Sequence, residues 1–108
     1  MDIRPALHAY LDWPAHQNPM RAATVAVIEA LASAAIELAG TIAAGPLGGV
    51  SGEAAGVNPD GDRQRDIDLV ADRLMREALR SAPVAAVLSE EAELPETLNA
   101  DAPLCVVL

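Results

Sequence analysis

Four acidic residues stand at the two ends of one stretch of this chain, and their types and spacing could do chemistry. Asp62 and Asp68 open the stretch six residues apart, and the adjacent Glu90 and Glu91 close it. Carboxylates gathered in one place repel one another unless a cation lies between them, and a divalent cation takes such oxygen ligands. With cations bound between them, the same acids can bind an anionic small molecule. We therefore treat these four residues as a candidate cation site.

A helix is expected between the two acidic pairs, beginning near Asp62 and ending near Arg80. Its apolar residues recur at helical spacing and form one face, made of Ile67, Val70, Ala71, Leu74 and Ala78. Acids crowd its first turns and arginines its last ones, as the helix dipole favours, and Asp72 with Arg76 makes an i, i+4 pair of the favourable orientation. The same pattern gives a purely structural explanation for the acids at the helix start.

A short apolar run, Val84 to Leu88, is predicted to be a buried strand, because it is uncharged and bounded by turn residues. Glu90 and Glu91 follow it directly, at the carboxyl end of the strand, where α/β folds bind ligands. A solvated run of charge is the alternative interpretation, since Glu93 and Glu96 come soon after.

The residues after this strand are expected to form a loop and then a second strand. Ala92 to Pro103 is acidic and rich in turn residues, and the apolar run from Leu104 to Leu108 is typical of a buried strand. Cys105, the one cysteine of the chain, lies inside this run. We expect it to be a small buried hydrophobic residue, and a single cysteine without a disulfide partner suits a reducing compartment.

The long apolar segment in the first half of the chain is predicted to be one helix. Asn18 and Pro19 form a helix start signal, with Asn as the N-cap and Pro in the first turn. The predicted apolar face comprises Thr24, Ile28, Leu31, Ala35, Leu38 and Ile42, and Glu29, Ser33 and Glu37 repeat on another face. We prefer a soluble buried helix to a membrane span, because two glutamates interrupt the segment and glycine and proline follow it.

The flanking segments carry weaker signals. A short helix ended by Trp13-Pro14 is expected at the start, with an apolar side made of Leu7, Tyr10 and Leu11. His8 and His16 are too loosely related for a metal pair, so surface or capping roles are expected. Residues 45 to 56 are predicted to be a glycine-rich connector, and they contain no phosphate-binding glycine motif.

Composition narrows the class of protein. The chain has 108 residues, of which 52% are hydrophobic but only 2% aromatic, so its core must consist of small aliphatic side chains. A formal net charge of −9 without any run of Lys or Arg argues against a nucleic-acid partner. The first residues lack the basic start and apolar region of a signal peptide, so a cytoplasmic location is expected.

The order of these features resembles class I fructose-1,6-bisphosphatase. The resemblance rests on Asn58-x-x-Gly61-Asp62, on Asp68 six residues later, on the helix and strand that lead to Ser89-Glu90-Glu91, and on the strand Cys105-Val106-Val107. It covers roughly residues 20 to 108, and its specific part is residues 58 to 91. The wider superfamily of metal-dependent phosphomonoesterases, including inositol monophosphatase, shares the general plan, but the inositol enzymes resemble a Gly-Glu-Glu pattern instead.

The resemblance implies a role for each acidic residue. Glu90 is expected to bridge catalytic Mg²⁺ ions and Asp62 to help bind a further ion, while Asp68 and Glu91 match the pair that polarises the attacking water. Asn58 is expected to shape a loop that closes over the site. These types suit the reaction, because a phosphate monoester needs its charge neutralised by Mg²⁺ and its water needs a carboxylate base.

The family's next element, Asp-Pro-Leu/Ile-Asp-Gly-Ser/Thr, supplies two further metal ligands and does not occur in these residues. We therefore expect residues 1–108 to be the amino-terminal portion of a sugar phosphatase domain and to be inactive alone. The expected fold is α/β, with two long helices packed on the first strands of a layered sandwich. The family implies a sugar phosphate substrate, a role in gluconeogenesis or the Calvin cycle, and a homo-oligomer, a tetramer in the family. An inositol-phosphate substrate and a non-catalytic acidic helical module that binds a partner are the alternatives.

Overall fold

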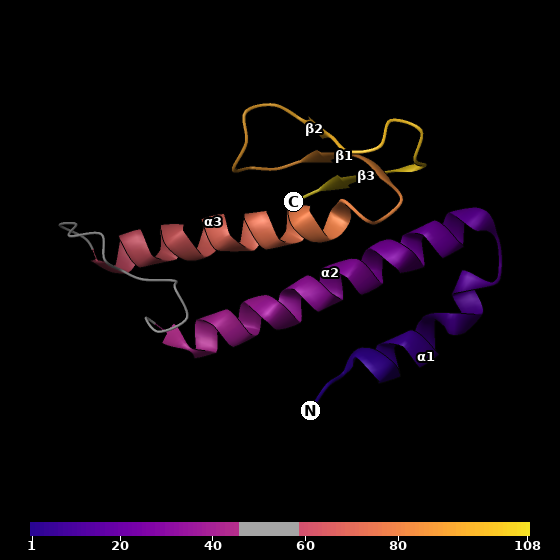
Figure 1. Ribbon diagram of the computed structural model, residues 1–108, viewed down its shortest axis with the longest axis horizontal. Helices are drawn as coiled ribbons and strands as arrows, with labels where there is room; N and C mark the ends of the chain where they lie inside the picture. The colour runs from indigo at the N-terminus through magenta and orange to yellow at the C-terminus, as the bar shows by residue number, and fades with distance from the viewer. Residues whose placement is uncertain (46–58) are drawn as a thin grey trace.

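The computed structural model describes residues 1–45 and 59–108, without the side chains of residues 59–64. Its elements are α1 (Arg4–Ala15), α2 (Pro19–Ala43), α3 (Pro59–Leu79), β1 (Val84–Leu88), β2 (Glu96–Thr97) and β3 (Leu104–Val107). Figure 1 shows the small sheet along one side of α3, with α2 and then α1 on the other side. The predicted mixed α/β class is confirmed, with α3 between the small sheet and α2.

The start of α2 forms as its sequence predicts. The Asn18 side chain accepts a hydrogen bond of 2.9 Å from the Arg21 backbone N–H, and Pro19 occupies the first helical position. In α1, Leu11 is buried, whereas Tyr10, which we expected on the same apolar side, is exposed. Pro14 lies inside the last turn of α1 instead of ending it, so this helix continues to Ala15.

The predicted apolar face of α2 is wrong in part. The buried residues of α2 are Ala23, Val25, Val27 and Ala34, whereas Ile28 and Ile42 of the predicted face are 40% and 39% exposed. Since α2 lies between α1 and α3 (Figure 1), it buries two opposite sides. At 3.6 residues per turn, Val25 points away from Ala23, Val27 and Ala34, and the predicted face lies between the two buried sides. A search for one apolar stripe therefore finds the wrong positions.

Within the described residues, α2 is the one helix that is long and apolar enough to cross a membrane, with 25 residues and a mean hydropathy of 1.7. Length and composition alone are weak evidence of a span, because core helices of soluble proteins have the same properties. In this structure α2 packs against both α1 and α3, but only 17% of the apolar window is buried. Our prediction of a buried helix therefore holds only for the two sides that face other helices.

The core lies where α2, the end of α3 and the sheet meet. Leu79, Val84 and Val87 are fully buried, and Val27 joins them from α2. Val84 and Val87 belong to the predicted strand β1, which is the central strand of the order β2-β1-β3. Strand β3 runs parallel to β1, so the carboxyl ends of these two strands meet at one edge of the sheet.

Two predictions about the last third of the chain are wrong. The expected loop from Ala92 to Pro103 contains β2, which pairs antiparallel with β1; two residues are too few to show a strand period, and only their partner strand reveals them. Cys105, expected to be buried, is exposed. Strand β3 alternates between half-buried and exposed residues, and Cys105 and Val107 lie on its exposed side.

Candidate functional site

A hollow of about 330 Å³ lies beside the carboxyl end of β1. Helix α3 supplies one wall and the residues after β1 another; the lining residues are Asp68, Ala71, Asp72, Met75, Ser89, Glu90, Glu91 and Leu108. Three of the four acids that we singled out in the sequence, Asp68, Glu90 and Glu91, therefore line one hollow. They arrive there because Asp68 projects from α3 while the glutamates follow the end of a strand that packs beside this helix.

The two glutamates sit in a tight turn. The Ala92 backbone N–H donates to the Ser89 carbonyl oxygen at 3.1 Å, which closes a four-residue turn with Glu90 and Glu91 at its two central positions. Both glutamate side chains are exposed to solvent at the rim of the hollow. Their predicted position directly after a strand is thus confirmed, and the turn places both of them in the lining of the hollow.

The other two predicted residues are placed less fully. Helix α3 begins at Pro59, so Asp62 lies in its first turn and not at its start, and its side chain is outside the described part of the chain. The backbone separates Asp62 from Asp68 by about 9 Å along the helix axis, and the two positions do not share one helical face. Asn58, the predicted loop residue, lies outside the described residues.

Asp72 is the site residue that the sequence did not reveal. Its predicted ion pair with Arg76 is confirmed, with 2.8 Å between Asp72 Oδ2 and Arg76 Nη2. The sequence indicated only the i, i+4 pair, whereas the structure shows that Asp72 is 8% exposed and lines the hollow. The hydroxyl of Ser89 donates a hydrogen bond to Asp72 Oδ1. The i, i+4 spacing was a correct signal for the pair, and nothing in the spacing predicted its burial.

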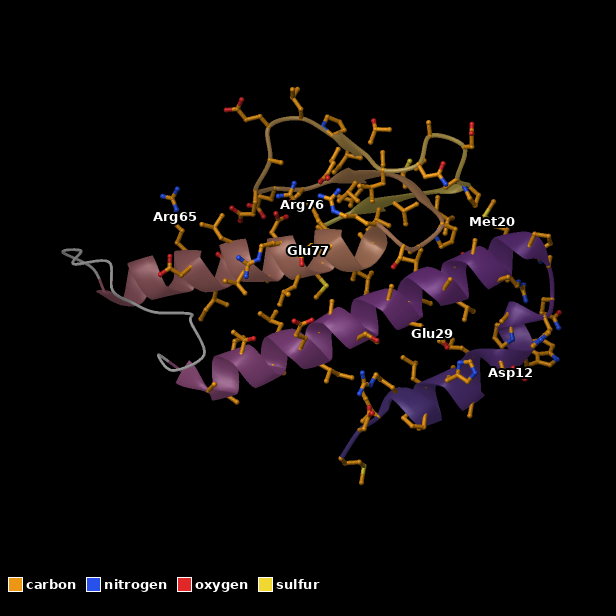
Figure 2. The ribbon with its side chains drawn as sticks, in the orientation of Figure 1. Asp12, Met20, Glu29, Arg65, Arg76 and Glu77 are labelled. Atoms are coloured by element: carbon orange, nitrogen blue, oxygen red, sulfur yellow. The ribbon has the colours of Figure 1, made fainter. Side chains whose placement is uncertain are left out.

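Arg76 also pairs with Glu96 of β2. Arg76 Nη1 lies 3.1 Å from Glu96 Oε2, and Arg80 Nη2 lies 2.6 Å from Glu96 Oε1. Figure 2 shows Arg76 on the side of α3 that faces the sheet. Glu96 is therefore not part of a solvated run of charge, as the alternative interpretation of this segment assumed. Arg76 of α3 and Arg80, which directly follows α3, pair with it instead, because β2 pairs with β1 beside the end of this helix.

The hollow contains oxygen donors of the kind that cations take, but the described residues do not make a full set of ligands. Its lining includes four carboxylates, of which Asp72 is already paired with Arg76, and carboxylate oxygens are the donors that Mg²⁺ prefers. Among the side chains that the structure describes, no group of three or more His, Cys, Asp or Glu could hold a metal ion. The donor types therefore fit Mg²⁺, whereas a full set of ligands would need groups beyond the described ones.

Neither histidine lines this hollow, and their hydrogen-bond partners belong to α1 and α2. His8 Nδ1 lies 2.6 Å from Glu29 Oε1 and joins α1 to α2, and His16 Nδ1 lies 2.7 Å from the Asp12 carbonyl oxygen at the end of α1. Both rings are exposed. The predicted surface and capping roles are confirmed, and the partner of His8 is Glu29, one of the residues that repeat on the polar face of α2.

Comparison with known proteins agrees with the resemblance to class I fructose-1,6-bisphosphatase. No protein-family model and no solved structure matches the chain significantly. Among curated proteins, it is 64% identical over 83 residues to fructose-1,6-bisphosphatase class 1 of Bradyrhizobium sp. strain ORS 278, covering 77% of this chain and 23% of that protein. It is 54% identical over 107 residues to fructose-1,6-bisphosphatase class 1 2 of Bradyrhizobium sp. strain BTAi1. This match covers 90% of this chain and 31% of that protein.

A third relative, fructose-1,6-bisphosphatase class 1 of Nitrobacter vulgaris, is 41% identical over 100 residues, covering 93% of this chain and 29% of the relative. The chain thus spans less than a third of the length of each of these three proteins. Identity of 41% to 64% over most of the chain is nevertheless far above what chance gives. The predicted resemblance is confirmed: over most of its length this chain is homologous to class 1 fructose-1,6-bisphosphatases.

Proposed function

We propose that this chain is the part of a fructose-1,6-bisphosphatase that supplies one carboxylate wall of the active site, where the 1-phosphate of fructose 1,6-bisphosphate is hydrolysed. One observation carries the proposal: Asp68, Glu90 and Glu91 come from two different elements and line one hollow at the carboxyl end of a strand. The names of the relatives support a sugar bisphosphate over the inositol-phosphate alternative.

The roles of the acids follow from their positions. We propose Glu90, at the rim of the hollow, as a Mg²⁺ ligand, together with Asp62 in the first turn of α3. Bound Mg²⁺ would neutralise the phosphate and stabilise the charge that develops during transfer. Asp68 and Glu91 would orient the attacking water and accept its proton, since a carboxylate within hydrogen-bond reach of water can act as its base.

Several finer features belong to the same proposal. The three described strands would be the beginning of a larger layered sandwich, and Asn58 would belong to a loop that closes over the site. We further propose a cytoplasmic enzyme of sugar phosphate metabolism, in gluconeogenesis or the Calvin cycle, that assembles as a homo-oligomer. The exposed outer side of β3 supports additional strands or layers, because it leaves apolar residues in water.

The test is a chimera in which residues 1–108 replace the matching segment of the Bradyrhizobium sp. strain ORS 278 protein. We expect Mg²⁺-dependent release of phosphate from fructose 1,6-bisphosphate, and much slower release from inositol 1-phosphate. A folded chimera, verified by circular dichroism and thermal unfolding, that releases no phosphate from either substrate would overturn the proposed function. Faster release from inositol 1-phosphate would move the substrate to the alternative class.

A further inference from the structure

The Ser89 hydroxyl connects α3 to the turn that carries the two glutamates. Its oxygen donates the hydroxyl proton to Asp72 Oδ1 and accepts a hydrogen bond of 3.1 Å from the Glu91 backbone N–H. A hydroxyl has one proton to donate and two lone pairs that accept. Because a carboxylate can only accept, Asp72 takes the proton, and a lone pair of Ser89 remains for the amide of Glu91.

The carboxylate of Asp72 is itself held in one orientation. Its side chain is 6% exposed, and its second oxygen pairs with Arg76, which in turn pairs with Glu96. Arg80 holds the other oxygen of Glu96. Charge-assisted hydrogen bonds are shorter and stronger than neutral ones, and a residue on a helix has a rigid backbone beneath it. Asp72 is therefore a fixed acceptor against which the Ser89 turn can be oriented.

The position of Asp72 on α3 gives this contact a consequence for the site. Asp68 lies four residues before Asp72 on the same helix, and because residues four apart are neighbours on a helix surface, the two share one helical face. Both line the hollow together with Glu90 and Glu91. A contact that fastens the turn to Asp72 therefore also sets the distance between Glu91 and Asp68, the two residues proposed to handle the water.

We propose that Asp72 and Ser89 are positioning residues that hold the Glu90-Glu91 turn in register with Asp68. Neither acts on the substrate; they act through the backbone of Glu91. The consequence for catalysis rests on the proposed function, whereas the fastening of the turn does not. In a site that transfers phosphate, a misplacement of about 1 Å can lower the rate about a hundredfold, so loss of this contact is expected to lower kcat.

The first experiment measures the fastening without any activity. Amide hydrogen exchange of Glu91 is followed by NMR in the 108-residue chain and in its Ser89→Ala, Ser89→Thr and Ser81→Ala variants. We expect Ser89→Ala to speed exchange of this amide about tenfold, because a hydrogen bond is lost, and Ser89→Thr to restore protection. Ser81 donates to the Ala78 carbonyl oxygen at the end of α3, so Ser81→Ala removes a hydroxyl elsewhere. An unprotected Glu91 amide in the parent chain, or one unaffected by Ser89→Ala, overturns the proposal.

The second experiment measures the consequence in the chimera. Ser89→Ala and Asp72→Ala should each lower kcat at least about tenfold with KM within about twofold, and the double variant should be little worse than either, since both remove one contact. Ser89→Thr and Asp72→Asn keep a hydroxyl and an acceptor and should recover most of the rate.

A core variant separates positioning from stability. Val27→Ala removes buried volume from the core cluster with Leu79, Val84 and Val87, none of which lines the hollow, and should lower Tm without lowering kcat. If Val27→Ala lowers kcat as much as Asp72→Ala at similar Tm, the effect of Asp72 is only structural and the proposal is wrong. A chimera without activity would overturn the proposed function alone, because the exchange of the Glu91 amide still decides whether the turn is fastened.

Discussion

Ser89 and Asp72 are seventeen residues apart in sequence, and the hydroxyl of the first donates to the carboxylate of the second at the wall of the hollow. This hydrogen bond joins the end of the central strand to the middle of a helix that packs beside it. Through the Ser89 hydroxyl, the buried carboxylate of Asp72 is connected to the turn that carries the exposed Glu90 and Glu91.

Substitution of Glu90 in the turn should lower activity far more than substitution of Glu93, which follows the turn. In the active chimera, Glu90→Gln should lower phosphate release at least about a hundredfold, because removing a ligand removes charge stabilisation in the transition state. Glu93 is exposed and does not line the hollow, so Glu93→Gln should stay within about twofold of the parent. Steady-state kinetics over a range of Mg²⁺ concentrations gives both values. Equal losses in the two variants would remove the basis for assigning Glu90.

Arg76 should matter more for stability than Arg80. Arg76→Met leaves the buried carboxylate of Asp72 without its cation, which costs about 3 kcal/mol. Arg80 is largely exposed and pairs with Glu96 at its tip, so Arg80→Met should cost about 0.5 kcal/mol. Urea unfolding of the 108-residue variants, followed by circular dichroism, measures the difference. Similar losses for both arginines would show that the burial of Asp72 does not make its pairing critical.

The isolated chain should associate with itself through the outer side of the sheet. Leu88 and Val107 are paired in register on neighbouring strands, at 42% and 76% exposure, and β3 is at the edge of the three-stranded sheet. Apolar surface and an unpaired strand edge both favour association. Sedimentation velocity in reducing buffer should show oligomers that Val107→Lys converts to monomers. Leu94→Lys, an exposed residue outside the strands, is the control; if it acts equally, another surface is responsible.

The 108 residues alone should release no phosphate from fructose 1,6-bisphosphate above a blank. The reason is the number of ligands, since Mg²⁺ requires about six oxygens in a near-octahedral arrangement and Glu90 with Asp62 supplies only a few. A phosphate assay with Mg²⁺ over a wide concentration range checks this. Turnover by the isolated chain that disappears in Glu91→Gln would mean that these residues contain a complete active site.

Local patterns in the sequence determined much of what the structure contains. The cap at Asn18, the strand at Val84–Leu88 and the pair of Asp72 with Arg76 each depend on residues close together in the chain, so their signals survive without any tertiary context. The position of Glu90 and Glu91 after a strand was predictable for the same reason. Their shared hollow with Asp68 followed from the order of one helix and one strand.

Only the tertiary structure decided which sides of these elements are buried and which charges meet. Helix α2 buries two opposite sides because it lies between two helices, and no single periodicity describes such a helix. Glu96 meets Arg76 and Arg80 because the two-residue strand that carries it pairs with β1, and Asp72 is buried where the Ser89 hydroxyl reaches it. Contacts of this kind join residues far apart in the chain, and the free energy that selects them comes from packing, which the order of residue types does not display.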